Sequence, residues 1–180
     1  DLEIISIVCD IFIELELEDS VLKINHLGDK DTKEIFLSEL LKYLKNYDGK
    51  LNESDSEKLN KNPLRLLDSK DSELKNFLNK GPKIIDFLSP EQLNLLDMIQ
   101  SVFGKYVEIE LDSSLVRGLD YYTGLVFEAV SSNLGAQDSF LGGGRYDDLS
   151  QDLGGKEMPA IGFAIGLERL NLIKKQKNIK

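Results

Sequence analysis

The sequence is poor in cysteine, histidine and proline, and it contains no tryptophan. With Cys9 as the single cysteine, the chain can form neither an internal disulfide nor a cysteine-based metal site. We therefore expect no protein-bound metal and a reducing compartment, the cytoplasm. No apolar run approaches the roughly 18 residues that span a membrane, and no secretory signal is visible. These absences favour a globular protein without a membrane partner.

Positive charge is also scarce. The 180 residues carry 22 Lys and Arg against 32 Asp and Glu, which gives a formal net charge of -10. This balance argues against a general nucleic-acid-binding domain, because phosphate contact normally needs a basic face. The charge is uneven: the first twenty residues hold seven acids and no base, whereas residues 174–177 are basic. A local basic patch therefore stays compatible with the sequence.

Two regular elements are predicted near the start of the chain. Apolar residues recur at helical spacing over residues 2–15 and predict a buried helix, although the β-branched content makes a strand the competing interpretation. Residues 21–25 alternate as a strand, which ends at Gly28. A chain of this length can bury one core with a small appended unit. Residues 1–28 are assigned to the main domain.

The next segment, residues 29–102, is rich in Lys, Asp, Asn and Leu and poor in Val. Asp31 and Glu34 fit a capping box before an apolar helix. Short helices are predicted over 71–79 and 90–103, the second beginning with a Ser-Pro pair that suits a cap and a first helical residue. The segment is predicted to be a small helical insertion of mixed charge.

The last segment, residues 103–180, has the pattern of a sheet. Residues 107–111, 125–130 and 160–164 are predicted strands, and a helix is expected over 166–175. The links between strands resemble hairpins, which favours an antiparallel sheet. The predicted fold class is therefore α+β, with the main domain resuming after the insertion.

An arginine between a strand and a glycine is the first candidate for chemistry. Arg117 precedes Gly118. A guanidinium held at a strand end can bind a carboxylate or phosphate and can stabilise negative charge that develops in a transition state. The competing interpretation is an ion pair with Asp120 or Glu128.

Two adjacent tyrosines follow this arginine. On a strand, Tyr121 and Tyr122 would point to opposite faces. Both can line one site only if the backbone turns there, which Gly118 and Gly124 would permit. Otherwise one ring is expected in the core and the other on the surface.

Two glycine-rich segments complete the candidates. Residues 142–144 would let a backbone approach a small ligand, although such segments also form ordinary bends and no Gly-Lys-Ser/Thr of a phosphate-binding loop follows. Gly162 and Gly166 flank a strand-to-helix junction beside Arg169. That guanidinium can stack on a base, reach a phosphate, or pair with an acid on its own surface. His26, the only histidine, lacks the partners of a zinc or hydrolase site.

Taken in order, residues 115–128, 142–149 and 159–170 resemble three segments of histidyl-tRNA synthetase. The first is similar to the histidine-specific motif, and the last is similar to motif 3 of class II aminoacyl-tRNA synthetases. Residues 62–70 and 1–5 resemble the bacterial-type family as well, so the likeness covers nearly the whole chain. It implies part of a class II antiparallel sheet with flanking helices, plus a helical insertion.

The resemblance implies an enzyme that joins L-histidine to ATP and transfers the histidyl group to tRNA(His). Arg117 would be the catalytic residue, contacting the histidine carboxylate or the α-phosphate, and Arg169 would hold ATP by stacking and charge. Mg²⁺ is expected with ATP, through ligands that the sequence does not identify. The insertion would grip the tRNA acceptor end, and the full-length protein would be a homodimer. The residues implied in histidine binding are Arg117, Tyr121, Tyr122, Gly143, Gly144 and Tyr146.

The chain departs from the family in what it lacks. Motifs 1 and 2 and the anticodon-binding domain are not found, and the first residue is Asp1 rather than methionine. We therefore expect part of a catalytic domain, inactive by itself. Two alternatives remain: the regulatory subunit of ATP phosphoribosyltransferase, and a synthetase-like domain that senses uncharged tRNA in a signalling protein. The first usually lacks the insertion and has an altered histidine motif, whereas Asp120, Tyr121, Tyr122 and Glu128 are intact here. The second tends to lose the active-site residues that this chain keeps.

Overall fold

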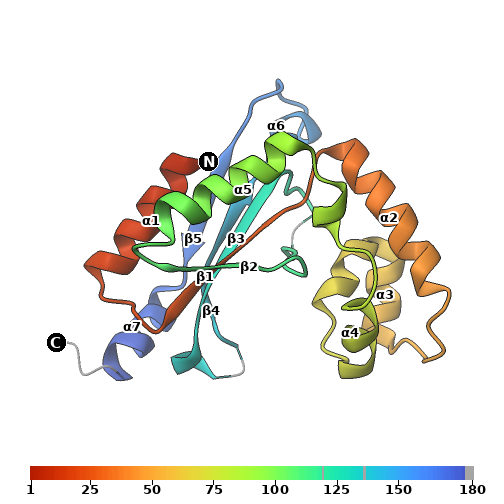
Figure 1. Cartoon of the computed structure of the whole chain (residues 1–180), viewed down its shortest axis with the longest axis horizontal. Helices are drawn as coiled ribbons and strands as arrows, with labels where there is room; N and C mark the ends of the chain where they lie inside the picture. Colours follow the sequence, from red (N-terminus) through yellow and green to blue (C-terminus); the bar gives the residue numbers. More distant parts are fainter. Residues whose placement is uncertain (119, 136, 177–180) are drawn as a thin grey trace.

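The structure, a computed structural model, describes residues 1–118, 120–135 and 137–176. Within them, five strands form one sheet in the order β2-β1-β3-β4-β5 (Figure 1). β1 and β2 pair in parallel, and the other neighbours pair antiparallel, which confirms the predicted α+β class with a mostly antiparallel sheet. The strands are β1 (Ser20–His26), β2 (Glu108–Leu111), β3 (Leu125–Ser131), β4 (Ser139–Arg145) and β5 (Ile161–Ile165).

One group of helices covers a face of this sheet, and a second group lies beside the sheet (Figure 1). The helices that share a buried cluster with the sheet are α1 (Leu2–Glu14), α5 (Pro90–Phe103) and α7 (Leu167–Gln176). The elements beside the sheet are α2 (Lys30–Leu44), α3 (Glu53–Lys61), η1 (Pro63–Asp68), α4 (Ser72–Leu78) and η2 (Ile84–Phe87). Two short elements, η3 (Ser132–Leu134) and α6 (Leu149–Asp152), lie in connections between strands.

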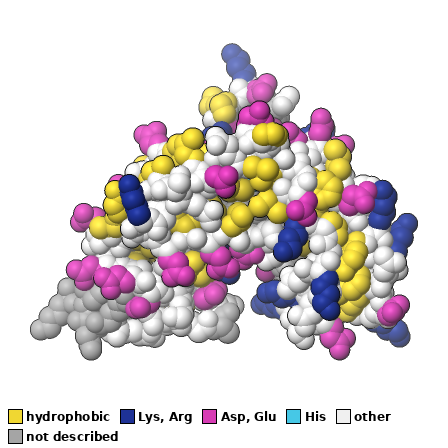
Figure 2. All heavy atoms as spheres, in the orientation of Figure 1, with side chains coloured by type: hydrophobic (Ala, Val, Ile, Leu, Met, Phe, Trp, Pro, Cys, Tyr) yellow, Lys and Arg dark blue, Asp and Glu magenta, His cyan; other side chains and the backbone are white. Residues whose placement is uncertain are grey.

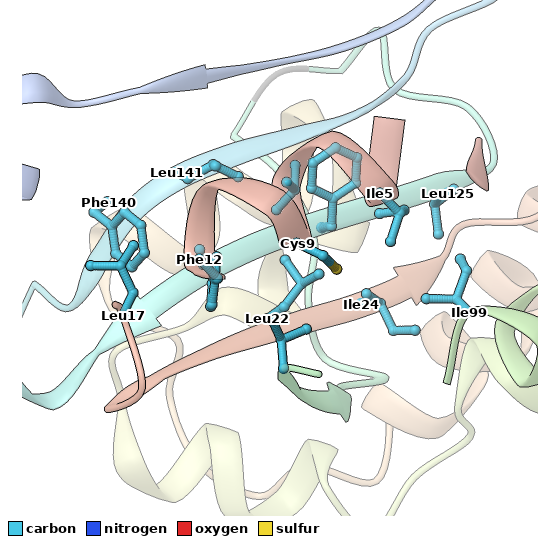
Figure 3. Close-up of a cluster of buried hydrophobic side chains, with 14 of the residues drawn as sticks. Ile5, Cys9, Phe12, Leu17, Leu22, Ile24, Ile99, Leu125, Phe140 and Leu141 are labelled. Carbon is cyan, nitrogen blue, oxygen red and sulfur yellow. The ribbon is translucent and has the colours of Figure 1, made fainter. Parts of the chain in front are cut away.

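Every second residue of a strand points toward the helices that cover the sheet, and the residues that do so are mostly apolar. Leu22 and Ile24 of β1 and Phe127 of β3 are fully buried there. Ile5 and Phe12 of α1 meet them in a single cluster (Figure 3). Burial of each such side chain contributes about 1.5–3 kcal/mol. The helical prediction for residues 2–15 is thereby confirmed, and the competing strand is excluded.

A second buried cluster lies under the helices beside the sheet. It is built mainly from leucines of the segment between β1 and α5, and it also takes in residues that follow β2. Leu115, Tyr122 and Val126 join this cluster, so the segment after β2 packs against the helices beside the sheet. Lys and Arg side chains are visible over these helices in Figure 2. The cluster members from the segment between β1 and α5 are Leu27, Phe36, Leu40, Leu64, Leu66, Leu74, Leu78 and Ile84.

Two helix starts test the capping predictions. α2 begins after Asp29, whose side chain accepts a 2.8 Å hydrogen bond from Thr32 N, so the predicted capping box at Asp31 and Glu34 is wrong. Asp29 takes that place because its backbone is extended where the helix begins, as an N-cap requires. α5 is capped by Ser89 and begins with Pro90, as predicted, and Ser89 also forms a reciprocal capping box with Gln92.

The position of α5 bears on the predicted division into residues 1–28, 29–102 and 103–180. Leu96 and Ile99 of α5 are buried in the cluster of the sheet, not in that of the insertion. The division stays a prediction, with α5 packing on the sheet side. None of the helices in the described ranges is long and apolar enough to cross a membrane.

Candidate active site

The face of the sheet opposite α1 and α5 carries Glu128 and several small residues, and at one end Val126 is buried in the second cluster. Glu128 alternates with the buried residues of β3 and therefore points away from the helices. The register places Gly142 beside it and Ala164 beside Gly142, while Gly144 lies opposite Gly162. Four small residues thus leave the centre of this face without bulky side chains. We call this surface the open face, and the helix-covered surface the packed face.

Arg117 lies on the open face. Its Nη1 donates a 2.7 Å hydrogen bond to Glu128 Oε1, and a side chain at Gly142 would overlap its guanidinium. Its Nε is buried and has no partner among the described residues. The ion pair with Glu128 that the sequence left open is therefore formed. Asp120 instead accepts a 2.6 Å bond from Asn62 Nδ2 of the insertion.

The two adjacent tyrosines share one aromatic cluster. The ring centroids of Tyr121 and Tyr122 are 4.7 Å apart, and Tyr146 meets them edge-on at 5.7 Å and 6.3 Å. The residues around both tyrosines are not in a strand, and Gly124 has a φ of 72°. A turn in the backbone therefore brings both rings to one side, which is the condition for both tyrosines to line one site. Burial and the neighbouring Tyr122 raise the pKa of Tyr121, which keeps its phenol protonated.

Three glycines on the open face each clear room for one functional side chain. A Cβ at Gly144 would lie 2.8 Å from a carbon of the Tyr122 ring, and one at Gly162 would lie 3.0 Å from the Tyr146 hydroxyl. No larger residue fits without displacing the side chain above it. The pairs are Arg117 over Gly142, Tyr122 over Gly144 and Tyr146 over Gly162.

Gly143 faces the other way. A Cβ there would overlap Gly162 O and would lie 2.6 Å from Phe163 and 2.7 Å from Phe127, both on the packed face. The missing side chain therefore makes room for the core rather than for a ligand. The implied place of Gly143 in a histidine pocket stays a prediction.

The Arg169 guanidinium donates hydrogen bonds to two backbone carbonyls and one side-chain oxygen. Nη1 donates to Gln137 O at 2.6 Å and to Ser139 O at 2.9 Å, and Nη2 donates to Gln137 Oε1 at 2.9 Å. These in-plane donors are thus directed at the entry to β4. The flat face of the group takes no part in these bonds and can stack on a ring, and these three bonds leave two of the five N–H donors, one on Nε and one on Nη2. The implied role of Arg169 with ATP stays a prediction.

Comparison with known proteins bears on the family to which the chain belongs. Residues 1–170 match the sequence profile described as Histidyl-tRNA synthetase. The chain belongs to the histidyl-tRNA synthetase family.

Individual relatives agree with this assignment. The chain is 45% identical over 175 residues to a histidine–tRNA ligase of Francisella philomiragia subsp. philomiragia, covering 96% of the chain and 41% of that protein. It is 40% identical over 179 residues to a histidine–tRNA ligase of Chlorobium luteolum, covering 98% and 42%. The crystal structure of apo S. aureus histidyl-tRNA synthetase superposes with a TM-score of 0.73 at 28% identity, over 99% of the chain and 44% of that structure. The chain spans about two fifths of the length of the curated relatives.

Sequence reasoning missed the residues by which the segment between β1 and α5 holds the segment that carries Arg117 and the two tyrosines. Lys33 Nζ donates a 2.6 Å bond to Tyr122 O, and burial lowers the pKa of Lys33. Asn62, Lys33 and Arg65 line one small cavity together with Arg117. Nothing local marks Lys33, because its partner is 89 residues away. The insertion thus positions the segment that carries the catalytic candidate.

Other charged residues near the site have structural partners. Arg145 bonds Asp1 and Asp147 at 2.9 Å each. His26 Nδ1 accepts a 3.0 Å bond from Gly28 N. Burial lowers the pKa of His26 to about 4; Lys33 and Arg145 add to the lowering, while Asp29 opposes it.

In the described part of the chain, no three His, Cys, Asp or Glu residues lie close enough together to hold a metal ion.

Proposed function

We propose that this chain is part of the catalytic domain of a histidine–tRNA ligase, a class II aminoacyl-tRNA synthetase. The enzyme would activate L-histidine with ATP to histidyl-adenylate and then transfer the histidyl group to tRNA(His). The observation that carries the proposal is the open face, where Arg117 is fixed over Gly142 next to a cluster of tyrosines. Family membership over residues 1–170 supports the same activity.

In this proposal Arg117 is the catalytic residue. An oxygen of the histidine carboxylate attacks the α-phosphorus of ATP, and pyrophosphate leaves. Negative charge is then spread over the phosphoryl oxygens, where a preorganised cation has its largest effect. With Nη1 donating to Glu128 and Nε buried, Nη2 of Arg117 would meet the carboxylate or the α-phosphate.

The tyrosine cluster would bind the substrate side chain. Tyr121 and Tyr122 lie together, and a phenol can hydrogen-bond an imidazole nitrogen. The raised pKa of Tyr121 supports a donor role at physiological pH. Gly144 and Tyr146 would complete the wall of the pocket, and Gly143 would do so only through its backbone.

ATP would contact Arg169 through the flat face of the guanidinium. Three of its five in-plane N–H donors bond Gln137 and Ser139, which supports stacking on the base through the flat face. Mg²⁺ would enter with ATP. The described residues offer no cluster of three carboxylate, imidazole or thiol ligands for it, so we assign no Mg²⁺ ligand to this chain.

The remaining partners follow from the family. The insertion would contact the acceptor end of tRNA(His), to which its lysines would contribute positive charge although the whole chain has a net charge of -10. The complete enzyme would be a cytoplasmic homodimer. Because the chain spans 41% of a curated relative, we expect it to form no histidyl-adenylate by itself.

The test is pyrophosphate exchange by the purified complete enzyme, with histidine and with each other amino acid in turn. We expect exchange that depends on histidine, and none from the 180-residue chain alone. Absence of histidine-dependent exchange in the complete enzyme would overturn the proposed activity. Robust exchange by the 180-residue chain would overturn the expectation that it is only part of the site.

A further inference from the structure

A β-bulge redirects one side chain on β4. In the pairing of β3 with β4, Ala129 lies opposite Leu141. The next pair is Val130 with Ser139, so Phe140 is an extra residue on β4. Strict alternation from the buried Leu141 would turn Ser139 to the packed face. The bulge brings Ser139 to the open face instead, as such irregularities often do beside functional sites.

On the open face, the Ser139 hydroxyl donates a 2.6 Å hydrogen bond to Glu128 Oε1. That same oxygen accepts the 2.7 Å bond from Arg117 Nη1. Arg117 and Glu128 are each about one quarter exposed, at 23% and 24% of their side-chain surface, so solvent competes only partly for these bonds. The orientation of the Arg117 guanidinium therefore depends on one carboxylate oxygen, which Ser139 holds from the other side.

Ser139 also contacts the second arginine of the site. Its carbonyl oxygen accepts Arg169 Nη1 at 2.9 Å. Arg169 belongs to α7, whereas Arg117 belongs to the connection between β2 and β3. Ser139 thus contacts Arg169 directly and Arg117 through Glu128, and the two arginines come from different elements.

We propose that Ser139 is a positioning residue, whose hydroxyl acts through Glu128 to fix the Arg117 guanidinium and whose carbonyl sets Arg169 relative to it. The inference rests on the proposed activation of histidine. Without the hydroxyl, the Glu128 carboxylate loses one of its two donors and can leave its place. A misplacement of about 1 Å in a reacting group costs on the order of 10- to 100-fold in rate. Because Arg117 would act in the transition state, the loss falls on kcat rather than on KM.

The first experiment uses the complete enzyme with Ser139→Ala, Ser139→Thr and, as a matched control, Ser132→Ala at an exposed serine of η3. In histidine-dependent pyrophosphate exchange, we expect Ser139→Ala to lower kcat about 10-fold with little change in KM for histidine or ATP. Ser139→Thr keeps the hydroxyl and should retain most of kcat. Unchanged kcat in Ser139→Ala, or an equal loss in Ser139→Thr, overturns the inference.

A double-mutant cycle tests whether Ser139 acts through Glu128. If it does, Ser139→Ala costs nothing further in a Glu128→Ala background, where the acceptor of the Ser139 hydroxyl is gone, whereas independent residues give additive losses. Losses that add in full would overturn the proposed route. An inactive wild-type enzyme would instead contradict the proposed function itself.

The inference can also be tested without activity. In the ¹⁵N-labelled 180-residue chain, the Nε–Hε resonance of Arg117 reports the order of its guanidinium. We expect Ser139→Ala to shift and broaden this resonance, and Ser139→Thr to leave it near its wild-type position. An Arg117 resonance that is the same in wild type and Ser139→Ala would overturn the positioning role, whatever the enzyme assay gives.

Discussion

The two faces of the sheet are formed by the same strands but carry different kinds of side chain. On the packed face, Leu22, Ile24 and Phe127 are fully buried against α1. On the open face, one residue away along the chain, Glu128 faces Gly142 and holds Arg117. Adjacent positions therefore differ in what a substitution would damage. The packed face stabilises the fold, whereas in the proposed function the open face keeps space and charge for a substrate.

The open face adds little to stability by itself. Arg117 and Glu128 are partly exposed, and ion pairs of this kind contribute only ~0–1 kcal/mol. The buried Nε of Arg117, which lacks a partner among the described residues, adds a cost instead. A residue set that does not improve stability is the kind expected at a functional site. The following substitutions test this difference between the faces.

The largest expected effect is on the packed face. Phe127→Ala removes a fully buried ring that packs with Phe163 and should lower the free energy of unfolding by about 3–5 kcal/mol. Urea denaturation of the 180-residue chain measures this loss. Val130→Ala, on the same strand but half-buried on the open face, is the matched control and should cost clearly less. Equal losses would contradict the division into two faces.

Two adjacent glycines of β4 give the next contrast. Gly143→Ala overpacks the core against Phe127 and should cost about 1–3 kcal/mol of stability. Gly142→Ala overlaps Arg117 instead, so the unfolding free energy should change by less than ~1 kcal/mol while pyrophosphate exchange by the complete enzyme falls on the order of 10-fold or more. Denaturation and kinetics on both variants check this. A reversed pattern would mean that the faces are wrongly assigned.

His26 gives a pH-dependent effect of intermediate size. Its folded pKa, about 4, lies below the unfolded value of 6.5, so the unfolded state binds more protons between these values. Stability should therefore be full above pH 6.5 and should fall by about 1–2 kcal/mol on acidification to pH 5. Denaturation midpoints measured from pH 7.5 to 5 check this, with His26→Gln as the comparison. Because this is the only histidine, an equally steep slope in the variant would assign the effect elsewhere.

The smallest effect is expected on the surface of the insertion. Lys61 pairs with Glu57 at 3.3 Å, with side chains 73% and 63% exposed. Lys61→Ala should change the free energy of unfolding by no more than ~0.5 kcal/mol. A loss above about 1 kcal/mol would show that such surface pairs stabilise the insertion after all.

Much of the fold could be predicted from local signals. The helical spacing of residues 2–15 and the Ser89 cap predicted α1 and α5, because those signals act within a few residues. Residues 142–144 suggested close approach to a small ligand or an ordinary bend. They lie inside β4, and the small residues Gly142 and Gly144 make room for Arg117 and Tyr122 above them. The need for this room arises only once distant segments meet.

The sequence suggested residues for the candidate site, but not the residues that hold them in place. Arg117, Tyr121 and Tyr122 could be chosen because they are close in sequence and chemically distinctive. Lys33 could not, because its contact with Tyr122 joins residues 89 positions apart. Ser139 could not either, because the β-bulge that turns it to the open face depends on the pairing of two strands.

The most direct measurement is the rate of histidyl-adenylate formation by the complete enzyme carrying Arg117→Ala, together with its affinity for histidine. The predicted result is a rate lowered on the order of 100-fold or more, with a much smaller change in histidine binding, as for other contacts made in a transition state. Arg117→Lys, which keeps the charge but not the planar group, should fall between the two. Unchanged turnover in Arg117→Ala would contradict the assignment of the open face as the site of histidine activation.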